Sequence, residues 1–98
     1  MASKKSKNKN QAKNGVVSFT PNAWDEYLLW QKENPKIVDE INNLIEECRR
    51  NPFKGTGKPE PLKGNLTGFW SRRITNEHRF VYLPEDETIY VVSCRYHY

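Results

Sequence analysis

The residues best suited to chemistry lie in a basic stretch between Arg49 and Arg79. This stretch holds eight Lys or Arg residues and only two carboxylates, Glu60 and Glu77. Glu60 lies within the run Lys54–Lys63, which is rich in Gly, Pro and Lys. A carboxylate among cations can accept a proton while the cations bind a charged substrate. The stretch therefore predicts a localised anionic partner such as phosphate.

These side chains suit cleavage of RNA without a metal ion. That reaction needs a base for the ribose 2′-OH, an acid for the departing 5′-oxygen, and cations for the charge that builds on the phosphate. Glu60 is the only carboxylate of the Lys54–Lys63 run, which makes it the candidate base. His97 has an imidazole suited to acid–base work, and the neighbouring Tyr98 can stack on a nucleobase.

Arg73 and Arg79 are the candidate phosphate ligands. They lie three residues either side of Asn76, so a hairpin that turns at Asn76 and Glu77 brings them close together. A guanidinium binds phosphate oxygens in a bidentate manner that a lysine ammonium cannot match. Arg72 and Arg73 alternate across the predicted strand, so one of the two should face solvent or a carboxylate.

Each assignment also has a simpler interpretation. Glu60 fits a solvated loop acid or an N-cap partner. His97 fits a surface histidine near the end of a chain, and Arg49 and Arg50 fit the negative end of a helix dipole. His78 opens a strand and is interpreted as structural.

Other enzyme classes find little support in the sequence. The run Gly55–Lys58 has the wrong spacing for a nucleotide-binding loop, and no serine lies in a nucleophile elbow. Neither the histidines, His78 and His97, nor the cysteines, Cys48 and Cys94, show metal-ligand spacing. We therefore expect no metal and no cofactor, and we expect the cysteines to be buried, reduced thiols.

The part of the chain that must position the candidate site residues begins with a strand at residues 16–19, followed by two helices. Thr20 is typical of an N-cap before a helix at 22–33, and Asn34 repeats this pattern before a helix at 35–50. The second helix carries apolar residues with a 3.6-residue period. Three tryptophans are expected in the core: Trp24, Trp30 and Trp70.

Three strands are predicted in the second half of the chain, after a Pro- and Gly-rich loop at residues 52–67. Their alternating patterns cover residues 68–75, 78–83 and 88–98, and the short turns between them favour an antiparallel sheet. The helical pair can cover one face of that sheet. The predicted fold class is therefore α+β, with an N-terminal strand and a two-helix hairpin packed on an antiparallel sheet.

Residues 1–15 differ from the rest because they carry five lysines and no acid. They predict a disordered basic tail, either an RNA-contacting arm or a leader without a role, in front of one domain at residues 16–98. No run of about 18 apolar residues and no secretory signal is present. We therefore expect a cytoplasmic protein that does not contact a membrane.

Several longer motifs extend through the domain. They are Trp24-Asp25-Glu26-Tyr27-Leu28, Trp30-Gln31, Gly57–Lys63, Leu66–Thr75, His78-Arg79 and Cys94–Tyr98. Together they resemble the YoeB/Txe family, toxins of type II toxin–antitoxin systems that are related to RelE. The resemblance covers about residues 17–98 and leaves out only the basic tail.

This resemblance implies a fold like that of RelE and the microbial ribonucleases. It implies a ribosome-dependent endoribonuclease that cuts mRNA in the decoding site and leaves a 2′,3′-cyclic phosphate. By resemblance, Glu60 is the general base, Arg79 the transition-state arginine and His97 the general acid. The remaining matching positions are substrate contacts: Lys63, Arg73 and Tyr98.

The resemblance also implies the partners. These are mRNA, the bacterial ribosome, an antitoxin of the YefM/Phd type and possibly a second copy of the chain. The basic stretch taken alone leaves one alternative of a different class open, a non-catalytic module that binds RNA or the ribosome and blocks translation.

Overall fold

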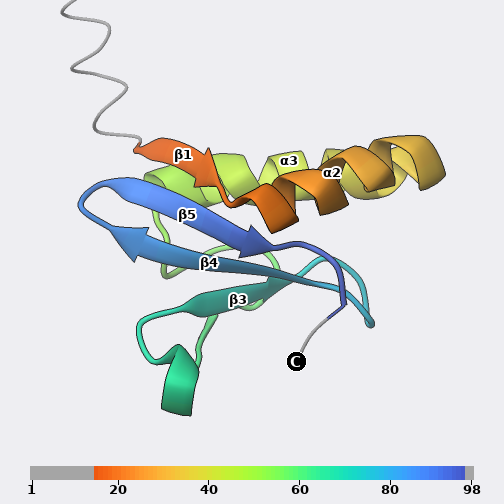
Figure 1. The fold of residues 1–98 in the computed structure, drawn as a ribbon. Coiled ribbons are helices and arrows are strands. Elements are labelled where there is room, and N and C mark those ends of the chain that lie inside the picture. The colour runs from red at the N-terminus through yellow and green to blue at the C-terminus, as the bar shows by residue number, and fades with distance from the viewer. Residues whose placement is uncertain (1–14, 97–98) are drawn as a thin grey trace, which may run out of the picture.

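Two helices lie along one side of a five-stranded sheet (Figure 1). The computed structural model describes residues 15–96, and the strands follow the order β1-β5-β4-β3-β2 across the sheet. This arrangement confirms the α+β class. In chain order the elements are β1 (Val16–Phe19), α2 (Pro21–Glu33), α3 (Pro35–Arg50), β2 (Glu60–Pro61), η1 (Gly64–Leu66), β3 (Trp70–Arg73), β4 (Arg79–Glu85) and β5 (Thr88–Ser93).

The helices begin where the sequence predicted. Thr20 is the N-cap of α2, and its Oγ1 accepts the Ala23 N–H at 3.1 Å. Asn34 precedes α3, but its side chain makes no capping hydrogen bond, so that part of the prediction was wrong. Asn34 also ends α2, because its backbone N–H donates to the Trp30 carbonyl.

Both helices contact β1 and β5, and their buried residues share one core with Phe80 and Tyr82 of β4. The two cysteines are free and buried, as predicted, and burial raises the pKa of Cys48 to about 11 and that of Cys94 to about 12. Trp30 is buried, whereas Trp24 is 46% exposed and was wrongly expected in the core. The core residues are Ala23, Trp30, Ile41, Leu44, Cys48, Phe80, Tyr82, Ile89, Val91 and Cys94.

The sheet is mixed, not purely antiparallel. β1 pairs in parallel with β5, in the register Val16 with Thr88, while the other strand pairs are antiparallel. A parallel pair needs a long connection, and here the two helices and the other strands provide it. The sequence predicted β1 as a strand but not its partner.

Two strand boundaries also differ from the prediction. Glu60 and Pro61 form the short edge strand β2 inside the predicted loop, where a proline is tolerated because it has no N–H to leave unpaired. β5 ends at Ser93, short of the predicted 98, because the Cys94 N–H leaves the sheet and donates to the Glu26 carboxylate.

Among residues 15–96, no helix is long and apolar enough to cross a membrane. Residues 1–14 of the predicted basic tail lie outside the described residues, as do His97 and Tyr98. Gly15, the first described residue, is buried.

Candidate active site

The strand register brings Glu60, Arg73 and Arg79 onto one face of the sheet. Arg73 pairs directly with Arg79 across β3 and β4, and Glu60 pairs with Ser71, two residues before Arg73. Directly paired residues share a face, and so do residues two apart on one strand. The opposite face carries Phe80 and Tyr82, which are fully buried in the core with the helices. The three candidate residues therefore lie on the face turned away from the helices.

The pairing of Arg73 with Arg79 confirms the predicted hairpin. Two like charges directly opposite each other are destabilising in a sheet. Within residues 15–96, neither arginine forms an ion pair. Arg79 instead donates from Nη1 to three carbonyl oxygens of its own turn, those of Thr75 at 2.9 Å, Asn76 at 3.1 Å and His78 at 3.2 Å. The turn thus fixes one edge of the Arg79 guanidinium and leaves the charge of the pair without a carboxylate partner in the described chain.

Arg72, the neighbour of Arg73, points to the other face and is fully buried. As predicted, one arginine of this pair is exposed and the other meets a carboxylate, with Arg72 Nη1 lying 3.4 Å from Glu47 Oε1. Its guanidinium donates to the loop after α3, at the carbonyls of Asn51, Lys54 and Thr56, and its Nε donates to the Tyr82 hydroxyl. Arg72 therefore fixes the loop that leads to Glu60 and is not free to bind phosphate.

The same loop contacts β3 through its glycines. The Gly57 carbonyl accepts the Arg73 N–H at 2.7 Å. Gly57 has φ +86°, and a Cβ there would lie only 3.0 Å from the Arg73 carbonyl oxygen. Close approach and positive φ both require glycine at this position. Glu47 holds the loop from α3, because its carboxylate accepts the Thr56 N–H at 2.7 Å, and hydrogen bonding to the side chain and backbone of Thr56 lowers the pKa of Glu47.

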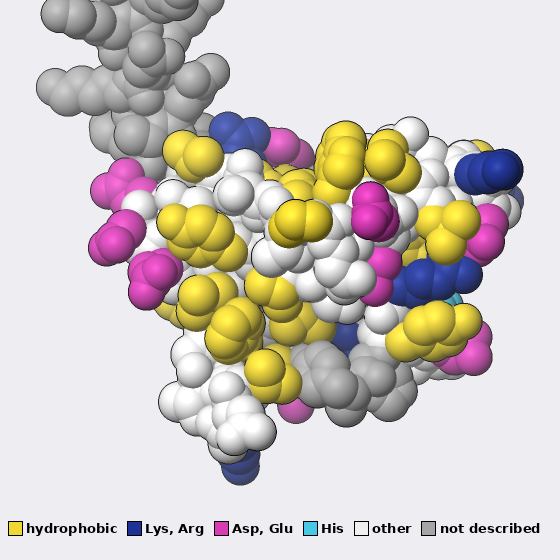
Figure 2. All heavy atoms as spheres, viewed as in Figure 1, with side chains coloured by type: hydrophobic (Ala, Val, Ile, Leu, Met, Phe, Trp, Pro, Cys, Tyr) yellow, Lys and Arg dark blue, Asp and Glu magenta, His cyan; other side chains and the backbone are white. Residues whose placement is uncertain are grey.

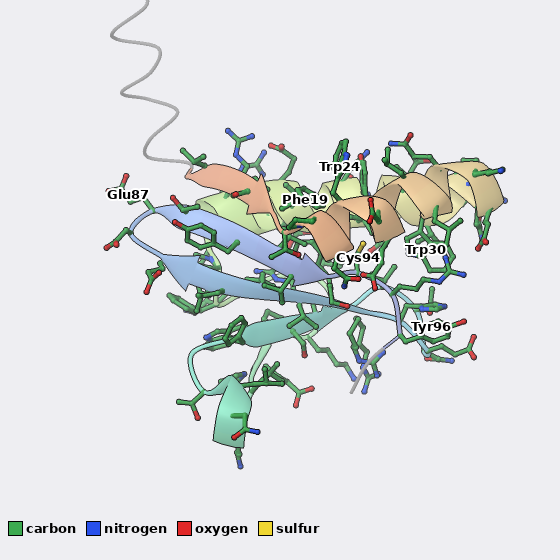
Figure 3. All side chains as sticks on the ribbon, in the orientation of Figure 1. Phe19, Trp24, Trp30, Glu87, Cys94 and Tyr96 are labelled. Atoms are coloured by element: carbon green, nitrogen blue, oxygen red, sulfur yellow. The ribbon has the colours of Figure 1, made fainter. Side chains whose placement is uncertain are left out.

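Helix α2 anchors the chain that follows β5. Glu26 Oε1 accepts the Cys94 N–H at 2.8 Å, and Trp30 Nε1 donates to the Cys94 carbonyl at 2.9 Å. Glu33 Oε1 binds Arg95 Nη2 at 2.8 Å, and the Arg95 guanidinium stacks at 4.2 Å on the ring of Trp30, which lies near Cys94 in Figure 3. Sequence analysis missed this anchor, although Glu26, Trp30 and Glu33 recur at the spacing of one helix face.

The hairpin holds the next residue, Tyr96. The Arg79 N–H donates to the Tyr96 carbonyl at 2.9 Å, and the Tyr96 N–H donates to His78 Nδ1 at 2.7 Å. The described chain therefore ends beside Arg79, one residue before His97. Lys63 is exposed, just before η1 and two residues after β2.

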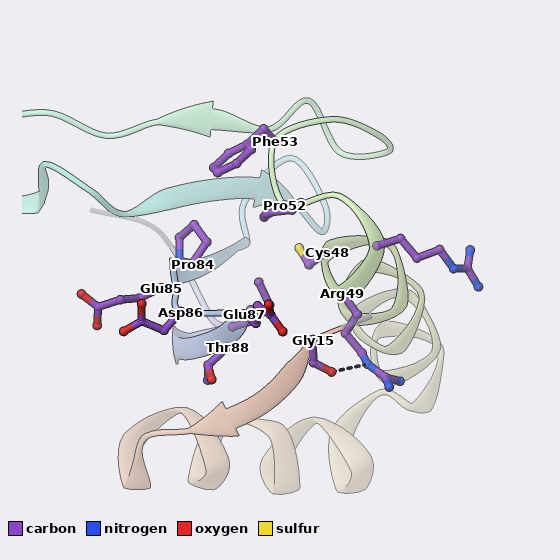
Figure 4. A pocket seen from close by; sticks show the side chains of 12 residues that line it. Gly15, Cys48, Arg49, Pro52, Phe53, Pro84, Glu85, Asp86, Glu87 and Thr88 are labelled. Carbon is purple, nitrogen blue, oxygen red and sulfur yellow. Dashed lines mark hydrogen bonds between the residues drawn. The ribbon is translucent and has the colours of Figure 1, made fainter. Parts of the chain in front are cut away.

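A pocket of about 300 Å³ lies at the other end of β4 and β5 (Figure 4). Its lining includes Cys48, Arg49 and Phe53 on one side and the acidic turn Glu85–Glu87 on the other, but none of the predicted site residues. Acidic side chains gather at this end of the molecule (Figure 2). Among the described candidate residues, Glu60 and Arg73 are exposed and Arg79 is partly buried. Among residues 15–96, no group of three or more His, Cys, Asp or Glu residues is placed to hold a metal ion.

Comparison with solved structures defines the class of protein. A mutant of the YafQ toxin from Escherichia coli has the same fold, with a TM-score of 0.71 at 15% identity over 84% of this chain and 92% of that one. A YoeB/ParE toxin from Agrobacterium tumefaciens matches with a TM-score of 0.81 at 48% identity, over 85% of this chain and 99% of that one. The chain therefore has the fold of bacterial toxins from type II toxin–antitoxin systems.

The sequence comparisons identify the family within this class. The model of the "YoeB-like toxin of bacterial type II toxin-antitoxin system" matches residues 19–98. The YoeB toxin of Escherichia coli K12 is 56% identical over 80 residues, which cover 82% of this chain and 95% of that protein. The YoeB toxin of Streptomyces coelicolor is 50% identical over 82 residues, or 84% of this chain and 98% of that protein. The chain belongs to the YoeB family, as the resemblance of its motifs predicted.

Proposed function

We propose that this toxin is a ribosome-dependent endoribonuclease that cuts mRNA in the decoding site and so inhibits translation. The observation that best supports a phosphate site is the direct pairing of Arg73 with Arg79 across β3 and β4. Opposed arginines without a carboxylate partner are costly in a sheet, and such local conflicts are typical of functional sites. Glu60 lies on the same face as the pair, which supports a base beside the phosphate.

In the proposed reaction Glu60 accepts the proton of the ribose 2′-OH. The 2′-oxygen then forms a bond to the adjacent phosphorus, and the bond from phosphorus to the 5′-oxygen breaks. His97 donates a proton to the departing 5′-oxygen. The products are a 2′,3′-cyclic phosphate and a free 5′-hydroxyl, and the scheme requires neither a metal nor a cofactor.

Arg79 stabilises the negative charge that builds on the phosphate in this scheme. Its Nη1 is bound to the turn carbonyls, so the guanidinium is oriented before the substrate arrives. Its Nε and Nη2 then form the edge that binds two phosphate oxygens. The other substrate contacts fall to Arg73 and Lys63, and Tyr98 stacks on a nucleobase.

The exposure of the site residues is compatible with a role for the ribosome. Glu60 and Arg73 are exposed, so their side chains can reach an RNA strand that a larger partner presents. Binding in the decoding site would hold the mRNA against them in a reactive geometry. We accordingly place the activity in the cytoplasm, at the translating ribosome.

Solved relatives suggest the regulatory partner. A YoeB–YefM complex from Staphylococcus aureus matches with a TM-score of 0.79 at 48% identity, over 84% of this chain and 95% of that one. A YoeB dimer from the same organism matches with a TM-score of 0.81 at 45% identity, over 87% of this chain and 99% of that one. We infer that this chain binds a YefM-type antitoxin and can form a homodimer.

Primer extension on mRNA recovered from a translating extract tests the proposed function. New ends within the coding region, present with the toxin and absent without it, are the expected result. Stalled ribosomes on intact message would instead show a non-catalytic binding module. A Glu60→Gln variant that inhibits translation as strongly as the parental toxin would support the same alternative.

A further inference from the structure

Tyr96 has an unusual backbone conformation, with φ +59°. A residue other than glycine pays about 1 kcal/mol or more in this left-handed region, and such strain persists only where the surrounding structure holds it. Two hydrogen bonds hold it here. The Tyr96 N–H donates to His78 Nδ1 at 2.7 Å, and the Tyr96 carbonyl accepts the Arg79 N–H at 2.9 Å.

The His78 imidazole is itself held in one orientation. It is only 8% exposed, and its ring meets Trp30 edge-on at 4.7 Å and Tyr96 at 4.8 Å between centroids. The backbone of His78 is fixed as well, because its N–H donates to Thr75 Oγ1 at 3.1 Å. An Nδ1 that accepts a backbone N–H carries no proton, so the ring proton belongs on Nε2.

These contacts close a ring that joins two parts of the proposed site. The circuit of contacts runs from the His78 side chain to the Tyr96 N–H, and from the Tyr96 carbonyl to the Arg79 N–H. It then returns to His78 along the backbone. Arg79 is the proposed transition-state arginine, and Tyr96 is covalently bonded to His97, the proposed acid. The contacts therefore hold the Tyr96 backbone, the last that the structure describes, against the backbone of Arg79.

We propose that His78 is a positioning residue for cleavage, acting through its Nδ1 on the backbone of Tyr96. The inference rests on the proposed ribonuclease function, since it concerns the placement of the acid that this function requires. His78 itself does not touch the substrate in this account. A displacement of about 1 Å in a catalytic group can cost about 100-fold in rate, so loss of this hydrogen bond should lower kcat.

Two substitutions separate the hydrogen bond from the packing of the ring. His78→Phe keeps an aromatic ring against Trp30 and Tyr96 but removes the acceptor. His78→Asn keeps an acceptor, its Oδ1, near the position of Nδ1 but loses the ring and leaves a cavity beside Trp30. Positioning therefore predicts that His78→Phe is the less active variant, even though it keeps the aromatic packing that His78→Asn loses.

The test measures kcat and KM for cleavage on programmed ribosomes, together with unfolding by urea. We expect His78→Phe to lose about 10- to 100-fold in kcat with KM nearly unchanged, and His78→Asn to stay within about 5-fold of the parental kcat. Ile89→Val, at the other end of β5, is the control for a small loss of stability, and its kcat should be unaffected. Amide exchange of Tyr96 in the free protein should be slow in the parental and Asn proteins and fast in the Phe protein.

A higher kcat for His78→Phe than for His78→Asn would overturn the positioning role and leave the proposed function intact. Slow exchange of the Tyr96 amide in His78→Phe would overturn it as well, since the hydrogen bond would then be dispensable. If the parental toxin blocks translation without cutting the message, the proposed function fails and the inference fails with it.

Discussion

Replacing Arg72 by methionine should remove most of the stability of the fold. Arg72 is fully buried, and its guanidinium hydrogen bonds hold the loop after α3 against β3. The helices lie on the β1 and β5 side of the sheet, away from β3, and the loop after α3 contacts β3 instead (Figure 1). Methionine matches the side chain only as far as Nε, and it offers no donor to the three loop carbonyls or to Glu47.

The size of the loss follows from these contacts. Removing the fully buried guanidinium leaves several loop carbonyls and the partly exposed Glu47 carboxylate without a partner, which should cost about 3–5 kcal/mol. A domain of this size has a free energy of unfolding of about 5–10 kcal/mol, so the variant would be close to unfolding at 37 °C. Each kcal/mol lost from the free energy of unfolding lowers Tm by about 4–8 °C, so Tm should fall by at least about 12 °C.

Arg73→Met is the matched control, since it removes the same charge one residue further along the same strand. Arg73 is exposed and faces Arg79, so its loss should change the free energy of unfolding by no more than about 0.5 kcal/mol. Urea unfolding followed by circular dichroism measures both variants. A loss below about 1 kcal/mol for Arg72→Met, or equal losses for the two variants, would refute the assignment of Arg72 as the structural arginine.

The other predictions concern a titrating carboxylate, the thiols and Arg79. Glu47 has a lowered pKa in the folded protein because of its hydrogen bond to Thr56, so its ionised form stabilises the fold above the unfolded pKa of about 4.5. Glu47→Gln should therefore cost about 1 kcal/mol at pH 7, and urea unfolding should show this difference vanish as the pH falls through the folded pKa. Burial and raised pKa values should keep Cys48 and Cys94 unreactive toward a thiol reagent at pH 8 until the protein unfolds, and labelling in the native state at the rate of the denatured state would contradict this. Arg79→Lys should lower kcat by about 100-fold with little change in stability, because an ammonium cannot bind two phosphate oxygens side by side; a parental rate on programmed ribosomes would exclude the bidentate role.

Local signals predicted the helices and the hairpin correctly. Thr20 before Pro21 marked the start of α2, the 3.6-residue period marked α3, and the spacing about Asn76 placed Arg73 opposite Arg79. Each of these features is decided by residues close together in the sequence. The family resemblance added the assignment of Lys63 and the transition-state role of Arg79, which composition and spacing alone could not supply.

The errors arose where contacts between distant residues decide the structure. The sequence could not show which of Arg72 and Arg73 is buried, because the carbonyls that bind Arg72 belong to a loop about 20 residues away. Alternation continued β5 to the end of the chain, whereas Glu26 on α2 draws Cys94 out of the sheet. Trp24 is exposed because α2 turns that side outward, where its ring stacks on Tyr27.

The most direct test of the proposed mechanism is single-turnover cleavage of mRNA on programmed ribosomes by the parental toxin and by Glu60→Gln. Glu60 is exposed on the edge strand β2, so the substitution should leave folding and ribosome binding nearly unchanged. With Glu60 as the general base, the rate constant should fall by about 10²–10⁴-fold. Cleavage by Glu60→Gln at the parental rate would contradict the mechanism.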